Sequence, residues 1–103
     1  PNHEIVVLGT VVHEAVSILR ASVPATIELG LRDETAGAVT LGDPTQLQQV
    51  VLNLGTNAAH AVGARNGSIQ FLVTREEIHA PVETLAGTVR PGPWLRVTVI
   101  DSG

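Results

Sequence analysis

Five uncharged polar side chains recur along one side of a helix predicted over residues 43–62. They fall within a stripe roughly 80° wide, at about 100° per residue, and they are Gln46, Gln49, Asn53, Asn57 and His60. A solvated helix face usually carries Glu, Lys or Arg, whereas residues 44–64 contain none that is formally charged at neutral pH. Carboxamides and an imidazole can coordinate a cation or hydrogen-bond a ligand, so the stripe is a candidate binding surface.

Asp101 is the second side chain that suggests binding. If the strand predicted over residues 94–100 keeps its alternation, Asp101 falls on the apolar side of that strand, at the inner edge of the core. A carboxylate there is costly unless it is used, and because it only accepts hydrogen bonds, it suits the exocyclic amino group of a bound base. Gly103 would allow close approach by backbone or ligand. The alternative interpretation is a D-S-G turn that closes the strand.

The helix that carries the stripe has a well-marked start and an apolar side. Asp43 can cap it, Pro44 suits the first helical position, and Gln46 stands three residues after the cap, as in a capping box. Gly63 ends it. Seven residues fall within a sector of roughly 120° on the helical wheel and are predicted to pack on the core: Leu47, Val50, Val51, Leu54, Ala58, Ala61 and Val62.

The chain before this helix supplies supporting elements. We predict a strand over residues 4–9 and then an amphipathic helix, with Thr10 as its cap, that ends before Pro24. Alternating polarity predicts a half-buried strand over residues 26–31, and a short strand over residues 38–41 leads into the next helix.

We predict two strands in the chain after the helix. Residues 68–74 and 94–100 each place apolar side chains on one face and are plausible antiparallel neighbours. Residues 75–93 hold three prolines and two glycines, and we predict them to be irregular and mobile. The predicted fold is α/β: a two-layer sandwich, with one mixed sheet covered on one face by helices.

Composition limits the possible partners. With 103 residues the chain has room for one domain, and its net charge of −4, scattered arginines and two aromatic residues argue against nucleic-acid binding. The sequence has no cysteine, which fits a reducing compartment, and it contains no signal peptide or long apolar run. We therefore expect a cytoplasmic domain, whose parent protein could still be membrane-anchored.

Two segments together resemble a known family. D-P-T-Q-L-Q-Q-V-V-L-N-L-G-T-N-A-A-H-A resembles the N box of bacterial sensor histidine kinases, and V-I-D-S-G resembles the opening of their first glycine box. The same nucleotide-binding fold occurs in DNA gyrase, the mismatch-repair protein MutL and the heat-shock chaperone ATPases. The resemblance implies that residues 1–103 are a partial catalytic ATP-binding domain that ends inside the first glycine box.

The resemblance also implies a role for each site residue. Asn57 would bind Mg²⁺ and Asn53 would lie near the phosphates of ATP, while Asp101 would bind the adenine amino group beside Gly103. Mg²⁺ commonly keeps waters and substrate phosphates as ligands, so one amide oxygen from the protein is enough to anchor it. Many kinases of the family have a phosphate-contacting lysine where this chain has His60, so both a phosphate contact and a plain surface role stay open for His60.

Asn53 bears on the type of reaction. Gyrase and the chaperone ATPases carry a water-activating glutamate at the corresponding site, and an amide cannot act as that base. The resemblance thus favours transfer of the ATP γ-phosphate to a histidine on a separate dimerisation domain, with a response regulator's receiver domain as the next partner. No acceptor histidine is expected here, since His3 and His13 lack the family's Asn-Pro pattern. The alternatives are a related ATPase or protein-serine kinase, or a non-catalytic interaction module.

The resemblance stops before the flexible lid and the second glycine box. We therefore expect the chain by itself to be inactive, to bind ATP weakly or not at all, and to leave a sheet edge and apolar surface uncovered. Such an edge favours a homodimer or a domain-swapped oligomer.

Overall fold

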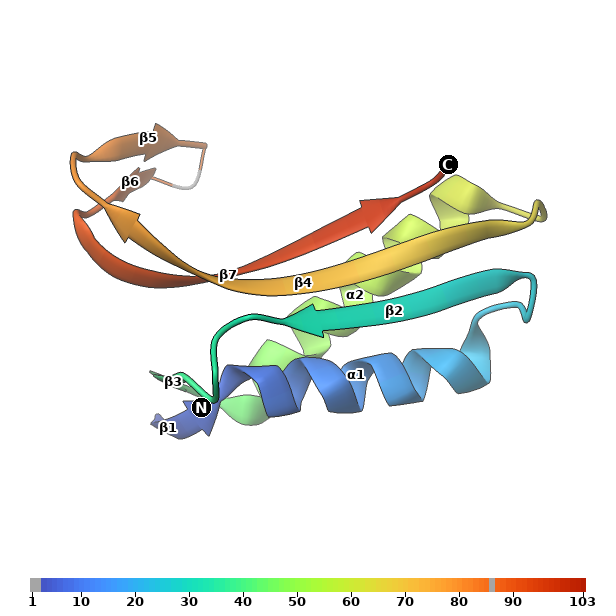
Figure 1. Cartoon of the computed structure of the whole chain (residues 1–103), viewed down its shortest axis with the longest axis horizontal. Helices are drawn as coiled ribbons and strands as arrows, with labels where there is room; N and C mark the ends of the chain where they lie inside the picture. The colour runs from blue at the N-terminus through green and yellow to red at the C-terminus, as the bar shows by residue number, and fades with distance from the viewer. Residues whose placement is uncertain (1–2, 86) are drawn as a thin grey trace.

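The computed structural model describes residues 3–85 and 87–103 and contains two helices among short and long strands (Figure 1). In chain order the elements are β1 (Glu4–Val7), α1 (Leu8–Ser22), β2 (Ile27–Asp33), β3 (Val39–Gly42), α2 (Pro44–Val62), β4 (Gly67–Ile78), β5 (Val82–Thr84), β6 (Gly87–Val89) and β7 (Gly92–Asp101).

The main sheet has the strand order β2-β4-β7 and is mixed. β2 runs parallel to β4, from the pair Ile27 and Gly67 to the pair Asp33 and Val73, and β7 runs antiparallel to β4. Both helices cover the same face of this sheet (Figure 1), with α2 in contact with β4 and β7 and α1 in contact with β2 and β4. The predicted α/β sandwich, a mixed sheet covered on one face by helices, is confirmed.

The core lies between the helices and β4. Ile69, Phe71 and Val73 alternate along β4 and are essentially inaccessible to solvent, as the pattern of the sequence predicts. They meet the buried side of α1, whose members recur at helical spacing: Leu8, Val11, Val12, Ala15, Val16 and Leu19.

Gly55 brings α2 close to this core. A Cβ built on Gly55 would overlap the side chain of Leu19 and press on the ring of Phe71. The missing side chain therefore lets the helix approach the sheet closely, which sets the depth at which the amide stripe stands above it.

The apolar side of α2 is rotated from the predicted one. Val50 and Leu54 were expected in the core but are 56 % and 40 % exposed, and Ala61 is exposed too. The helix turns its buried side toward α1 and β4 together, and this direction depends on where those neighbours lie rather than on the spacing of apolar residues. The buried members of the predicted stripe are Val51, Ala58 and Val62.

The first strand and helix differ from prediction in two ways. β1 pairs with β3 in a separate antiparallel ribbon, with Ile5 opposite Leu41, instead of joining the main sheet. α1 begins at Leu8, so Thr10 lies in its first turn and does not cap it; Val7 occupies the cap position without a side-chain hydrogen bond. Burial of Leu8 and Gly9 draws these residues into the helix.

The segment from residue 75 to 93 is more regular than predicted. β4 continues to Ile78, β7 begins at Gly92, and β5 and β6 form a hairpin between them, so that the β4–β7 pair extends beyond the helices as an arm (Figure 1). Positive φ angles of 127° at Gly87 and 131° at Gly92 make the turns that glycine permits. The mobility of this segment stays a prediction. Within the described residues, neither helix is both long and apolar enough to cross a membrane.

Candidate functional site

The start of α2 is built as its sequence predicts. Oδ1 of Asp43 accepts hydrogen bonds from the backbone N–H of Thr45 at 2.9 Å and of Gln46 at 3.3 Å, and Pro44 occupies the first helical position. Two N–H groups that have no partner inside the helix are thus satisfied, which fixes where the helix begins. The rotational phase of every side chain on the stripe follows from this start.

The amide stripe of α2 faces solvent. Gln46, Gln49, Asn53, Asn57 and His60 are all exposed. Nε2 of Gln49 donates to Oδ1 of Asn53 at 3.1 Å, one helical turn away. In the described part of the chain, the side chains of Asn57 and His60 make no hydrogen bond. The carboxamide oxygen of Asn57 is therefore available to a ligand or a cation.

Asp101 ends β7, and the register of the sheet fixes which way it faces. It stands opposite Ile69, whose side chain is 1 % exposed beneath the helices. Directly opposite residues of an antiparallel pair lie on the same face, so the half-buried Asp101 also faces the helix layer. This orientation agrees with the alternation seen in the sequence.

The D-S-G turn forms as well. The backbone N–H of Gly103 donates to Oδ1 of Asp101 at 3.0 Å, which is a local side-chain-to-backbone bond typical of such turns. The bond uses one carboxylate oxygen and leaves Oδ2 for another donor. The turn and a ligand contact are therefore compatible interpretations of the same residue.

Ser102 and Gly103 hold the end of β7 between β4 and α2. The backbone N–H of Ser102 donates to the carbonyl of Ser68 at 3.1 Å, and its hydroxyl accepts from the N–H of Ser68 at 2.9 Å. Gly103 lies so close to the helix that a Cβ there would overlap the carbonyl of Ala61. Because Ala61 is one turn beyond Asn57, the strand ends against the helix near the amide stripe.

The same arrangement of strands and helices occurs in solved kinase structures. The chain is similar to the nucleotide-free catalytic domain of histidine kinase ThkA, with a TM-score of 0.73 and 20 % identity over 100 % of this chain and 60 % of that chain. It is also similar to histidine kinase ThkA in its complex with response regulator protein TrrA, with a TM-score of 0.70 and 21 % identity over 98 % of this chain and 26 % of that chain. The chain has the fold of a histidine kinase catalytic domain. No protein-family model matches the sequence.

The larger hollows of this histidine kinase fold lie away from the predicted site. One hollow, of about 780 Å³, lies between β3 and the outer parts of β4 and β7, and it is lined by residues 38–40, 75–77 and 90–95. Two further hollows, of about 330 and 680 Å³, lie near residues 20–29 and near residues 25–28 and 66–68. Among the described residues, Asn53, Asn57, His60 and Asp101 line none of these three hollows.

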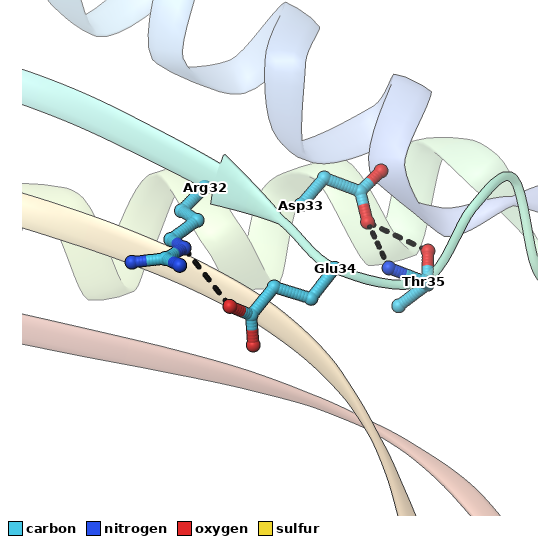
Figure 2. Close-up of polar contacts among 4 residues, drawn as sticks. All are labelled: Arg32, Asp33, Glu34 and Thr35. Carbon is cyan, nitrogen blue, oxygen red and sulfur yellow. Dashed lines mark hydrogen bonds and ion pairs between the residues drawn. The ribbon is translucent and has the colours of Figure 1, made fainter.

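One polar cluster of this histidine kinase fold was not expected from the sequence. Figure 2 shows Oδ1 of Asp33 accepting hydrogen bonds from the hydroxyl of Thr35 at 2.6 Å and from its backbone N–H at 2.9 Å. These bonds, the hydroxyl first, lower the pKa of Asp33 because they stabilise its charged form. Thr35 is fully buried, and its carbonyl accepts from Nε of Arg75 at 3.2 Å. The D-x-T spacing is typical of such local side-chain bonds, and it could have predicted this cluster from the sequence.

The Asp33 cluster lies beside the start of α1. Its Oδ2 lies against Gly9, where α1 begins, so closely that a Cβ on Gly9 would overlap it. α1 has neither a side-chain cap nor an acidic residue in its first turn, so the charge of Asp33 stands at the positive end of the helix dipole. The neighbouring ion pair (Figure 2) joins Nε of Arg32 to Oε2 of Glu34 at 2.9 Å; it is exposed and contributes little to stability.

Proposed function

We propose that this chain is the ATP-binding part of the catalytic region of a two-component sensor histidine kinase. The observation that carries the proposal is the meeting of its two motif segments: the D-S-G segment ends against α2 one turn beyond Asn57. The carboxylate of Asp101 faces the helix layer, and the unpartnered amide of Asn57 is exposed on the helix that the strand end approaches; we propose that both contact the same nucleotide. The fold of the solved catalytic domains supports the same conclusion.

The donor atoms suit ATP and Mg²⁺. Oδ2 of Asp101 would accept a hydrogen bond from the adenine amino group, since Oδ1 already accepts from Gly103. The oxygen of Asn57 is exposed and is the hard, neutral type of ligand that Mg²⁺ accepts. When bound, ATP supplies the transferable phosphoryl group and Mg²⁺ neutralises its charge.

The residues of α2 would bind and position the nucleotide, and the carboxamide of Asn53 cannot serve as a general base. Asn53 would lie near the phosphates, with its carboxamide oriented by the bond from Gln49. An amide cannot remove a proton from water, so this surface favours transfer to another group over hydrolysis. His60 is exposed on the same stripe and would contact phosphate or remain a surface residue. The acceptor would be a histidine on the upstream dimerisation domain.

The extent and partners of the chain are part of the proposal. The chain spans 60 % of the length of the solved catalytic domain it matches, and we propose that it is the N-terminal part of such a domain. By itself it would bind ATP weakly or not at all and would be inactive. Histidine kinase ThkA forms a complex with a response regulator, and we propose a response regulator's receiver domain as partner here too, with a cytoplasmic location.

The chemical nature of the phosphorylated product tests this function. The whole kinase that contains this region, incubated with ATP and Mg²⁺, should become labelled on a histidine of the dimerisation domain, with the acid-labile phosphate of a phosphoramidate. Acid-stable phosphoserine, or phosphate release without protein labelling, would support the alternative serine kinase or ATPase. No nucleotide binding at all by the whole protein would support an interaction module.

A further inference from the structure

The outer half of β4 has an open edge. β2 pairs with β4 only as far as Val73, whereas β7 pairs with it up to Ile78. In Figure 1 the β4–β7 arm accordingly continues past the end of β2. Within the described part of the chain, residues 74–78 of β4 therefore have a neighbouring strand on one side only.

The backbone groups on this edge can be identified from hydrogen bonds elsewhere on β4. The N–H of Gly67 and the carbonyl of Val73 bond toward the β2 side, to Thr26 and Glu34, while the carbonyl of Ser68 bonds toward β7. Odd-numbered residues thus point to the β2 side. The register between β4 and β7 continues one to one, without a bulge, to Ile78. The N–H and carbonyl groups of residues 75 and 77 therefore point out of the open edge.

The edge is accessible. The hollow of about 780 Å³ runs beside it, and three consecutive residues of β4 line this hollow, Arg75, Glu76 and Glu77. Residues 38–40 and 90–95 line the same hollow, so it lies between β3 and the β4–β7 arm. The loop after β2 contacts β4 where the open edge begins: the N–H of Glu34 donates to the carbonyl of Val73, and Nε of Arg75 donates to the carbonyl of Thr35.

Along the open edge, a basic and an acidic residue flank a carboxylate that is already paired. Arg75 and Glu77 are exposed, point to the same face of β4 two residues apart, and take part in no ion pair within the described residues. Glu76 points to the other face, where its carboxylate is paired with Arg96 at 2.8 Å. A basic and an acidic side chain thus remain unpaired on either side of a neutralised one.

This order is self-complementary, and we propose that a second copy of the chain adds its own β4 edge antiparallel to this one. With the two-fold axis at Glu76, Arg75 stands opposite Glu77 of the partner subunit, and Glu77 stands opposite Arg75 of the partner subunit. Both are pairs whose N–H and carbonyl groups point at each other, so the backbone bonds and the ion pairs form in the same register. The two Glu76 residues that meet at the axis are already neutralised.

Charged residues often protect an edge strand from pairing. Like charges that face each other across an edge would repel a second copy, whereas this order places opposite charges together in a single register. The edge is short, and contacts that bury less than about 1,200 Å² in total are typical of transient complexes. The proposed dimer is therefore a weak one that forms at high local concentration.

The edge lies at the far end of β4 from the proposed nucleotide site, because Asp101 stands opposite Ile69. Failure of the dimer and failure of the ATP-site proposal are therefore separable.

Analytical ultracentrifugation of the 103-residue chain, at concentrations rising to the millimolar range, should show a reversible dimer. Arg75→Glu and Glu77→Arg should each yield monomers, and the double variant should dimerise again, as should an equimolar mixture of the two single variants. Glu28→Arg, on the outer strand β2, is the matched control and should leave the dimer unchanged.

Glu77→Pro is an independent variant that removes an open-edge N–H without removing a bond to β7. It should yield a folded monomer by circular dichroism. A wild-type chain that stays monomeric at millimolar concentration overturns the proposal. So does a folded double variant, or an equimolar mixture of the folded single variants, that does not dimerise. The proposal also fails if Glu28→Arg loses as much dimer as the single edge variants.

Discussion

Asp101 stands directly opposite the buried Ile69 in the β4–β7 ladder, on the face of the sheet that the helices cover. The pair places a carboxylate at the border of the apolar core, where the last strand reaches α2. Because Gly103 follows within two residues and lies against the backbone of Ala61, the position of this carboxylate is tied to the helix.

Asp101→Asn should weaken ATP binding by the whole kinase by at least about tenfold, which corresponds to the roughly 1.5–3 kcal/mol typical of a hydrogen bond to a charged group. Asparagine keeps an oxygen that can accept from the N–H of Gly103, so the turn should persist while the charge is lost. Calorimetry measures the affinity, and Glu28→Gln, a surface carboxylate, serves as control. Equal affinity in wild type and Asp101→Asn would exclude the adenine contact.

Asn57→Ala should lower the apparent affinity for Mg²⁺ in the presence of ATP by about 10- to 100-fold, the range seen when groups around a bound metal are removed. The reason is that the unpartnered amide oxygen of Asn57 is the proposed protein ligand. Phosphorylation rates across a magnesium titration provide the measurement. Gln46→Ala removes another amide of the same exposed stripe and should have no effect; if both variants behave alike, Asn57 has no special role.

Asp33→Asn should make the stability of the chain less sensitive to acid. The folded-state pKa of Asp33 lies below its usual value because of the bonds from Thr35, so the charged form stabilises the fold above the ordinary pKa of about 4. That contribution disappears as the pH falls through the lowered pKa. Urea unfolding should be measured near neutral pH and in acid. The decrease in the urea midpoint from neutral to acidic pH should be larger for wild type than for Asp33→Asn.

Glu34→Gln is the matched control for this pH effect, since Glu34 forms only an exposed ion pair with Arg32. It should leave the acid dependence nearly unchanged. A wild-type profile that Asp33→Asn does not alter would show that the charge of Asp33 at the start of α1 adds no stability.

Gly55→Val should destabilise the fold by about 1–3 kcal/mol, the usual range for overpacking a core. The new side chain would collide with Leu19 and Phe71, which meet at this glycine. Equilibrium unfolding in urea measures the difference. Thr56→Val places the same side chain on the exposed neighbouring position and should change stability by less than about 0.5 kcal/mol. Similar losses in both variants would show that the close packing around Gly55 does not account for the effect.

Much of the fold could be predicted because its signals are local. Asp43 and Pro44 fix the start of α2 through bonds made within its first turn, and alternating side chains identify β4 and β7 because a strand has only two faces. The same local periodicity placed Asn53 and Asn57 on one exposed side of the helix. Their roles toward ATP and Mg²⁺ rest on resemblance and stay predictions.

Tertiary structure decided what depends on neighbours distant in sequence. Helical spacing shows which residues share a side but not the direction of the core, so Val50 and Leu54 came out exposed while Gly55 faces Leu19 and Phe71. β1 lies in a separate ribbon because it pairs with β3, a contact that the sequence alone does not reveal. The β4–β7 arm extends past the core because two paired strands can satisfy each other's backbone groups without core contacts. The proline- and glycine-rich composition of residues 75–93 did not indicate this pairing. The close approach of Gly103 to Ala61 joins residues 42 positions apart, and only packing brings such residues together.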